Sequence, residues 1–347
     1  RAFGRPVFSF LVGLALVCSG LTSVATQSRV FSVNLAQLFG WETIPVEALA
    51  FGFLMFMAGV VFRGIRESMW FNVICTVVEA TGLLIVIAVS LSYWGSVDYF
   101  QTPPEKADVG TALLILQGSI LTFFAFIGFE DTYNVAEEVK NPERTIPIAL
   151  VSAMLLATGL YIAVAISVVS VVPYHELALA PAPLAAVMEK AAPALPAFAL
   201  VAITMFAVAN TALVNYVTAS RMLYGMSNQG LRQTPHIAIL ILFAILAPLM
   251  FSATIKDLAS ATVLLLLFSF AIVNASLIVL KRRAGEPVGQ FEVPLFVPAL
   301  GCVFCVVLII VRIATGDVKA PLIAGVLIAG ILGLYWFLSS KKPAPQS

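Results

Sequence analysis

The run of residues from Phe123 to Arg144 places chemically active groups inside an apolar part of the chain. It reads FFAFIGFEDTYNVAEEVKNPER and begins as a stretch apolar enough for a helix in lipid. Gly128 stands in this stretch, and Glu130 and Asp131 follow it almost at once. A broken backbone and a carboxylate are costly in hydrocarbon, so they are expected where a cavity or a pathway needs them. The run therefore favours a transporter over a passive membrane anchor.

Gly128 is the residue at which the helix is expected to weaken, because glycine lacks a Cβ atom. If the helix unwinds from Ile127 to Glu130, carbonyls of its first half and amides of its second half become free to bind. Half-helix ends of this kind bind the amino or carboxylate groups of substrates in broken-helix transporters. The alternative is that Gly128 only allows another helix to pack closely.

Two acids are candidates for coupling a proton or cation to transport. Glu130 lies at the inner end of the expected break, and Glu79 lies near the middle of the apolar stretch 71–93. A charged acid near the bilayer centre costs about 2.5–3.5 kcal/mol on insertion scales, so a functional reason is expected. The alternative for Glu130, and more so for Asp131, is an interfacial acid in contact with cytoplasmic water. The alternative for Glu79 is a neutral, hydrogen-bonded acid that holds two helices together.

Other polar residues lie on apolar helices. Asn210 and Asn215 belong to a polar stripe in the stretch 195–226, but they do not share one face, so at most one lines any single cavity. Arg29 lies near the outer end of the first apolar stretch and is expected to extend its guanidinium to the interface.

The composition decides the broad class of protein. The 347 residues are 61% hydrophobic and 11% charged, whereas soluble domains have about 25% charged residues. A water-soluble fold could not bury this much apolar surface, so an all-α polytopic membrane protein is predicted. The net charge of +1 argues against nucleic-acid binding. Neither a phosphate-binding GxxxxGK[ST] loop nor an HExxH zinc motif occurs.

The four cysteines predict neither a metal site nor a redox site. They are Cys18, Cys75, Cys302 and Cys305, and all lie in apolar stretches. The last two form a CxxC pattern, but no histidine is nearby, so small apolar packing residues are the better interpretation. We therefore expect no cofactor and no metal.

Ten apolar stretches are long enough to be membrane spans, given about 20 residues for one crossing. An even number of spans places both termini on one side, and that side collects most of the 19 Lys and Arg residues, so it is predicted to be cytoplasmic. Residues 1–340 are thus expected to form one transmembrane domain, followed by a short cytoplasmic tail at 341–347. The expected spans are 7–30, 46–62, 71–93, 111–138, 146–172, 195–226, 236–252, 257–280, 294–315 and 320–338.

Four stretches resemble the amino acid–polyamine–organocation superfamily. FFAFIGFED, continued by AEEVKNPERTIPIAL, is similar to that family's sixth helix and the loop after it. FNVICTVVEATGLLIVI is similar to the fifth helix, VVPYHELALAPAPLAAV to the loop between helices seven and eight, and NYVTASRMLYGMSNQGL to the end of helix eight. The resemblance runs from about residue 3 to residue 340.

The resemblance implies a leucine-transporter-like fold of inverted repeats, with an amino acid or related amine bound at broken helices. Phe124 matches the aromatic gate of the sixth helix, and Ile127, Gly128 and Phe129 match its unwound segment. Glu130 matches an acid tied to proton sensing in some members. The expected function is secondary transport by alternating access, with proton coupling or exchange, in the plasma or inner membrane.

The chain also departs from the family pattern. Its ten spans align with helices three to twelve, so the first two helices, with the glycine-rich break that grips the substrate carboxylate, are expected to be missing. Glu79 stands where several members have a lysine. A truncated, non-transporting remnant is therefore an alternative. A membrane-embedded enzyme is a weaker one, since the two histidines, His175 and His236, are expected on opposite sides.

Overall fold

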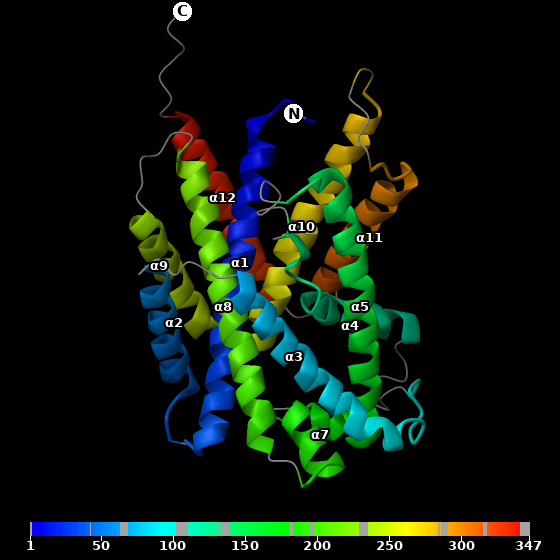
Figure 1. Ribbon diagram of the computed structural model, residues 1–347. Coiled ribbons are helices and arrows are strands. Elements are labelled where there is room, and N and C mark those ends of the chain that lie inside the picture. Colours follow the sequence, from blue (N-terminus) through cyan, green and yellow to red (C-terminus); the bar gives the residue numbers. More distant parts are fainter. Residues whose placement is uncertain are drawn as a thin grey trace, which may run out of the picture. The chain divides into compact units, whose positions relative to one another are not determined.

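The described secondary structure is entirely helical (Figure 1). The computed structural model describes residues 2–41, 43–62, 69–101, 110–130, 132, 139–180, 183–194, 197–228, 235–283, 285, 291–314 and 318–340. No β-strand occurs in these ranges. The helices are α1 (Pro6–Phe39), α2 (Val46–Phe62), α3 (Met69–Ser90), η1 (Leu91–Tyr93), α4 (Thr111–Phe124), α5 (Pro142–Val171), α6 (Tyr174–Leu177), α7 (Pro183–Ala191), α8 (Ala197–Asn228), α9 (Pro235–Ser252), α10 (Ile255–Lys281), α11 (Phe296–Ala314) and α12 (Lys319–Ser340).

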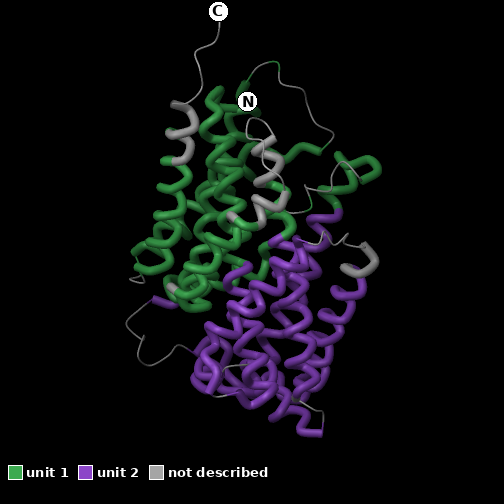
Figure 2. Tube along the Cα trace, turned by 90° about the vertical axis from the view of Figure 1, so that its left-hand side faces the viewer, with its two compact units in different colours: residues 1–23, 112–148, 217–347 green, residues 24–111, 149–216 purple. Residues whose placement is uncertain are grey.

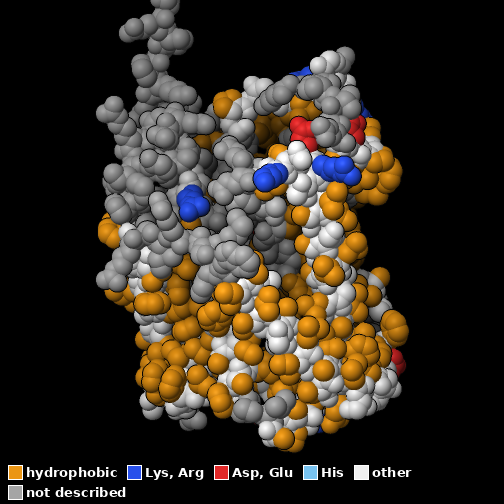
Figure 3. Space-filling model, in the orientation of Figure 1, with side chains coloured by type: hydrophobic (Ala, Val, Ile, Leu, Met, Phe, Trp, Pro, Cys, Tyr) orange, Lys and Arg blue, Asp and Glu red, His pale blue; other side chains and the backbone are white. Residues whose placement is uncertain are grey.

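Each of the ten predicted spans overlaps one of the longer helices, but the fourth, predicted over 111–138, is α-helical only to Phe124 in the part that the structure describes. Six of them are long and apolar enough to cross a membrane: α1, α3, α5, α8, α10 and α11. The apolar parts of α2, α4, α9 and α12 are shorter. Hydrophobic side chains dominate the visible described surface, as Figure 3 shows, which suits contact with lipid rather than water. The predicted all-α polytopic membrane fold is confirmed.

Several helix boundaries differ from the predicted spans. Helix α1 continues to Phe39, because residues 30–39 contain no glycine or proline that would end it. Helix α5 begins at Pro142, whose fixed φ and missing N–H suit the first position of a helix. Asn141 precedes it with φ of 51° and accepts hydrogen bonds from the amides of Arg144 and Thr145. The segment between the predicted spans 146–172 and 195–226 contains the short helices α6 and α7.

The chain divides into two compact units, drawn in two colours in Figure 2. The first unit comprises residues 1–23, 112–148 and 217–347. Its interior includes Ile120 of α4, Leu267 of α10 and Leu308 of α11, each almost completely buried. Polar groups are also paired there: the Thr262 hydroxyl of α10 donates to Thr22 Oγ1 of α1 over 2.7 Å. This unit carries the helix break predicted from the sequence.

The second unit comprises residues 24–111 and 149–216. Its core brings together apolar residues near the ends of α3, α5, α7 and α8: Val86, Val171, Val172, Val187, Met188 and Leu200. Hydrogen bonds then hold the loop after η1 against α5. Trp94 Nε1 donates to Ser167 Oγ over 3.0 Å, and the Tyr99 hydroxyl lies 2.9 Å from Ser170 Oγ. The loop is therefore tied to the same end of α5 that the apolar core covers.

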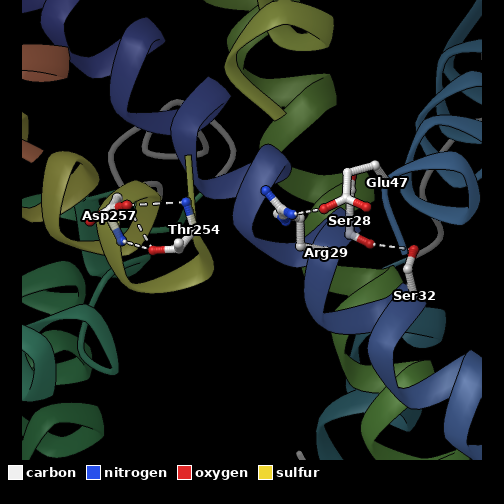
Figure 4. Close-up of polar contacts among 6 residues, drawn as sticks. All are labelled: Ser28, Arg29, Ser32, Glu47, Thr254 and Asp257. Atoms are coloured by element: carbon white, nitrogen blue, oxygen red, sulfur yellow. Dashed lines mark hydrogen bonds and ion pairs between the residues drawn. The ribbon is translucent and has the colours of Figure 1, made fainter. Parts of the chain in front are cut away.

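Figure 4 shows two polar contacts, a capping box at the start of α10 and an ion pair between α1 and α2. The Asp257 amide donates to Thr254 Oγ1, and the Thr254 amide and hydroxyl both donate to Asp257 Oδ2. This reciprocal capping box satisfies donors at the start of α10 and explains why the buried Asp257 is tolerated. Arg29 of α1 forms an ion pair with Glu47 in the first turn of α2, instead of extending only to the interface as the sequence suggested.

Candidate functional site

Helix α4 ends at Phe124, inside the stretch that resembles a broken helix. Just after this end, the backbone forms hydrogen bonds of the tighter i→i−3 type. The amides of Ala125, Phe126 and Ile127 donate to the carbonyl oxygens of Thr122, Phe123 and Phe124. The helix has 14 residues, so at 1.5 Å per residue it is about 21 Å long and shorter than the ~30 Å hydrocarbon core. The chain therefore changes direction or structure at this point instead of continuing as one straight span.

Gly128 supplies the backbone conformation that the break needs. Its φ is 121°, a value that L side chains rarely adopt. A Cβ atom placed on Gly128 would meet no heavy atom within 4 Å, so the conformation, and not close packing, accounts for glycine here. Within the described residues, no other helix approaches this position closely, so the positive φ is the observed reason for a glycine here.

Glu130 folds back onto the break. The Gly128 amide donates a hydrogen bond to Glu130 Oε2 over 2.9 Å, and the Glu130 side chain is half-buried. The acid and the glycine predicted separately from the sequence are thus joined by a direct contact. Asp131, predicted beside them, lies outside the described residues.

The aromatic and apolar residues of the break pack against α10 and α11. The Phe129 ring centroid lies 5.3 Å from that of Phe270 on α10, and the Phe123 centroid lies 6.4 Å from it. Phe124 and Ile127 contact the cluster of α4, α10 and α11 described above. Phe124, Ile127, Gly128, Phe129 and Glu130 are therefore neighbours within one compact unit.

Glu79 belongs to the other compact unit and has different neighbours. It lies on α3, and its Oε1 atom is buried without a hydrogen-bond partner among the described residues. The Asn210 side chain of α8 lies close enough to interact with the carboxyl group, and the Tyr161 hydroxyl of α5 senses its charge. Among the described polar side chains, Asn210 of α8 is thus the one placed to interact with the Glu79 carboxyl group.

Three of these neighbours could not be assigned from the sequence. Asn210 was one member of a polar stripe, with nothing to distinguish it from Asn215. Tyr161 and Phe270 have no unusual sequence context, because each stands in an ordinary apolar helix. Helical periodicity assigns residues to faces of one helix, but it does not say which face of another helix lies opposite.

The described residues offer few metal ligands. No group of three or more His, Cys, Asp or Glu side chains that could hold a metal ion occurs among them. Cys302 and Cys305 are free thiols on α11, and Cys302 Sγ lies 3.8 Å from the Ala271 carbonyl of α10. The contact is a weak helix–helix hydrogen bond of the kind expected for a packing residue.

These features define a polytopic α-helical membrane protein in which helix α4 ends shortly before a glycine of positive φ whose amide is bonded to an acid. Comparison with known proteins agrees, since a family model described as amino acid permease matches residues 1–332. The chain belongs to this amino acid permease family. The resemblance drawn from its sequence is thereby confirmed.

The individual relatives share about a quarter to a third of their aligned residues with the chain, over part of each protein's length. The branched-chain amino acid permease BcaP of Lactococcus lactis is 26% identical over 329 residues, which cover 85% of this chain and 70% of that protein. BcaP of Bacillus subtilis is 26% identical over 75% of the chain and 58% of that protein. The vacuolar cationic amino acid transporter 2 of Arabidopsis thaliana is 32% identical over 49% of the chain, but only 29% of that protein is covered.

Proposed function

We propose that this protein carries amino acids or related amines across a membrane by alternating access. Membership of the amino acid permease family supports transport of this substrate class. The observation that carries the proposal is the end of α4 at Phe124, followed by Gly128 in a conformation reserved for glycine and by an acid bonded to its amide. A passive anchor has no use for such a helix end within an apolar stretch, because irregular backbone is tolerated in a membrane only where protein or a water-filled cavity surrounds it.

Phe124, Ile127, Gly128 and Phe129 are the proposed substrate-binding residues. Carbonyl groups at the end of a half-helix carry partial negative charge, so they attract the ammonium group that amino acids and amines share. Phe124 is the proposed aromatic gate that closes over the bound substrate. The packing of Phe129 and Ile127 against α10 and α11 supports a rigid wall behind the binding segment.

Glu130 and Glu79 are the proposed coupling groups, for a proton or another cation. Glu130 is bonded to the backbone of the break, so a change in its protonation would change the acceptor that holds Gly128. Proton-coupled symport and exchange are both compatible with this arrangement. Relatives named for branched-chain and for cationic amino acids make both classes candidate substrates.

We place the protein in the plasma or inner membrane, with both ends of this chain on the cytoplasmic side. The support is the bias of Lys and Arg toward the loops on that side, which is the usual orientation signal in multi-pass proteins. Cysteine labelling of single introduced thiols in the two terminal segments, from either side of the membrane, tests this orientation.

The function is tested by uptake of labelled amino acids into proteoliposomes that contain the purified full-length protein. A panel of leucine, phenylalanine, alanine, arginine and lysine is used, with putrescine as a representative amine. Saturable uptake or counterflow of at least one of them, lost in liposomes without protein, is the expected result. If none is carried under either an imposed proton gradient or counterflow, in a preparation that remains folded and monodisperse, amino-acid transport is wrong.

A further inference from the structure

Basic residues gather at one end of the compact unit that comprises residues 1–23, 112–148 and 217–347. Arg282 and Arg283 directly follow α10, and Arg5 directly precedes α1. Figure 1 shows the start of α1, the start of α5 and the last turn of α10 at the same, upper end of this unit. All three helices are long and apolar enough to cross a membrane. The basic side chains therefore lie near the level at which the helices leave the hydrocarbon.

A hydrogen bond joins the end of α10 to the segment before α1. Arg283 Nη2 donates to the Ala2 carbonyl oxygen over 3.0 Å. Ala2 stands three residues before Arg5, and three residues of fully extended chain span at most about 11 Å. Arg282 is the sequence neighbour of Arg283. Arg5, Arg282 and Arg283 are therefore close together and form one group, the basic cluster.

The charge of the basic cluster is not neutralised by the acid beside it. Lys281 Nζ, one residue before the cluster, lies 3.1 Å from Glu292 Oε2, so this acid already has a partner. Within the described part of the chain, no ion pair joins Arg5 or Arg282 to an acid, and both residues are exposed. Like charges repel one another, so such a group is favoured where an anion from outside the protein can approach it.

The helix dipoles explain only part of this arrangement. A cation is favourable at the C-terminal end of a helix, which suits Arg282 and Arg283. Arg5 lies at the N-terminal end of α1, and the exposed Lys140 and Arg144 lie at that of α5, where a cation is unfavourable. An external anion accounts for cations at both kinds of helix end.

Exposed apolar side chains follow the cluster at the start of α11. Phe291 is 56% exposed and Phe296 is 62% exposed, and Glu292, which pairs with the end of α10, stands between them in the sequence. Leu300 lies one turn beyond Phe296 on the same face and is 63% exposed. Cations next to an exposed apolar surface suit a molecule with an anionic head and apolar chains.

We propose that the basic cluster of Arg5, Arg282 and Arg283 binds the phosphate headgroup of an anionic phospholipid, with the acyl chains beside the start of α11. Arginine suits this role, because its planar guanidinium can donate two parallel hydrogen bonds to phosphate oxygens. Basic residues next to membrane-spanning helices are attracted to anionic lipids. In the orientation proposed above, the lipid belongs to the cytoplasmic leaflet. The inference goes beyond the proposed transport function and does not depend on it.

The test measures lipid binding to the purified, delipidated full-length protein by native mass spectrometry. Two lipids with the same acyl chains are titrated, the anionic phosphatidylglycerol and the zwitterionic phosphatidylcholine, and inorganic phosphate is added as a competitor. The double variant Arg5→Gln with Arg282→Gln removes two charges, and Arg282→Lys keeps the charge. Lys256→Gln is the matched control, because it removes an exposed cation from the opposite end of α10.

The wild type is expected to bind its first phosphatidylglycerol at least about tenfold more tightly than phosphatidylcholine. Each basic residue near an anionic lipid contributes roughly fivefold in affinity, so the double variant should lose most of this preference. Lys256→Gln should keep the wild-type preference, and Arg282→Lys should keep most of it.

Equal binding of the two lipids by the wild type overturns the proposal, and so does a double variant that keeps the wild-type preference. Displacement of phosphatidylglycerol by excess inorganic phosphate would show a site for free anions and also overturns it. If the double variant does not fold, the single Arg282→Gln is measured in its place and should lose roughly fivefold.

Uptake into proteoliposomes separates this proposal from the transport function. A preference for phosphatidylglycerol in a wild type that carries no amino acid or amine leaves the lipid site standing, and the transport function fails. Uptake by a wild type that binds both lipids equally has the opposite meaning.

Discussion

The Gly128 amide donates a hydrogen bond to Glu130 Oε2 over 2.9 Å. The two residues are separated by Phe129 alone, so the carboxylate closes a small ring at the point where α4 has ended. A charged acceptor makes a stronger bond to a backbone N–H than a neutral one. The protonation state of Glu130 and the conformation of the segment around Gly128 are therefore energetically linked.

Replacing Glu130 by glutamine tests this link. The glutamine keeps a carbonyl oxygen that can accept the Gly128 N–H, but it cannot titrate. We expect Glu130→Gln to retain a folded protein and to show uptake that varies little from about pH 5 to about pH 8. The wild-type profile should vary over the same range. Initial uptake rates in proteoliposomes at fixed internal pH measure the difference.

The control is Glu143→Gln, which removes an exposed acid from the first turn of α5. Its pH profile should match that of the wild type. If Glu130→Gln also follows the wild-type rate at every pH, Glu130 does not couple protonation to transport and serves only to cap the Gly128 amide.

Gly128→Ala tests whether the positive φ at the break is required. No atom lies within 4 Å of the added Cβ, so the effect of this change is conformational and not steric crowding. A left-handed conformation costs an L residue about 1–2 kcal/mol, and the break should relax toward a longer helix. We expect a loss of uptake of at least about tenfold, which corresponds to 1.4 kcal/mol.

Gly118→Ala is the matched control for Gly128→Ala. Gly118 lies within α4, has an ordinary helical φ, and likewise has nothing within 4 Å of an added Cβ. Alanine there should leave uptake unchanged and raise stability by up to about 1 kcal/mol. Equal effects of the two changes would mean that the φ of Gly128 has no special role.

The sequence predicted the spans well and the polar contacts poorly, for a physical reason. Lipid requires long apolar helices, so hydrophobicity alone found a helix in each of the ten predicted spans, although α4 ends well before the predicted end of its span. The sequence also placed a weak point of the helix near Gly128, because a glycine followed closely by two acids in such a stretch is unusual, but α4 ends earlier than expected, at Phe124. The end of α1 at Phe39 was not foreseeable, since a helix can continue past the membrane without any change of composition.

Hydrophobic periodicity does not predict which side chains of two helices contact each other. Arg29 was expected to extend to the interface, but it forms an ion pair with Glu47, which lies 18 residues later on the next helix. Glu79 was recognised as an intramembrane acid, yet its neighbour Asn210 could not be told from Asn215. Both outcomes depend on the rotation of one helix relative to another, and packing determines that rotation.

The pairing of α10 with α11 should be sensitive to Gly301. A Cβ atom on Gly301 would lie 2.9 Å from Asn274 Oδ1, and Asn274 Nδ2 donates to the Phe270 carbonyl over 2.9 Å. Gly301→Ala must therefore move the Asn274 side chain and disturb that hydrogen bond. We expect a loss of about 1–3 kcal/mol, typical of overpacking, seen as a lower unfolding temperature in detergent.

Gly325→Ala on α12 is the control for Gly301→Ala, since nothing lies within 4 Å of its added Cβ. It should leave the unfolding temperature unchanged or slightly higher. The double change Gly301→Ala with Asn274→Ala should recover part of the loss, because the clashing atom is gone. A Gly301→Ala protein as stable as the wild type would mean that α10 and α11 are not packed as closely as the structure has them.

The ion pair of Arg29 and Glu47 should contribute little to the free energy of unfolding, and that contribution should be lost when either partner is removed. The Arg29 side chain is 14% exposed and that of Glu47 is 42% exposed, so solvent screens one end of the pair. Pairs of this kind contribute about 0.2–1 kcal/mol in double-mutant cycles. Because Arg29 is the more buried partner, removing Glu47 also takes a counter-charge away from a poorly solvated guanidinium. Glu47→Ala should therefore destabilise the protein more than Lys190→Ala, which removes an exposed charge from α7.

Unfolding temperatures of Arg29→Ala, Glu47→Ala and the double variant, at low and high salt, give the coupling free energy between the two side chains. This coupling free energy should favour the folded state and should become smaller as the salt concentration rises. Additive effects of the two substitutions would show that the two charges do not interact in solution.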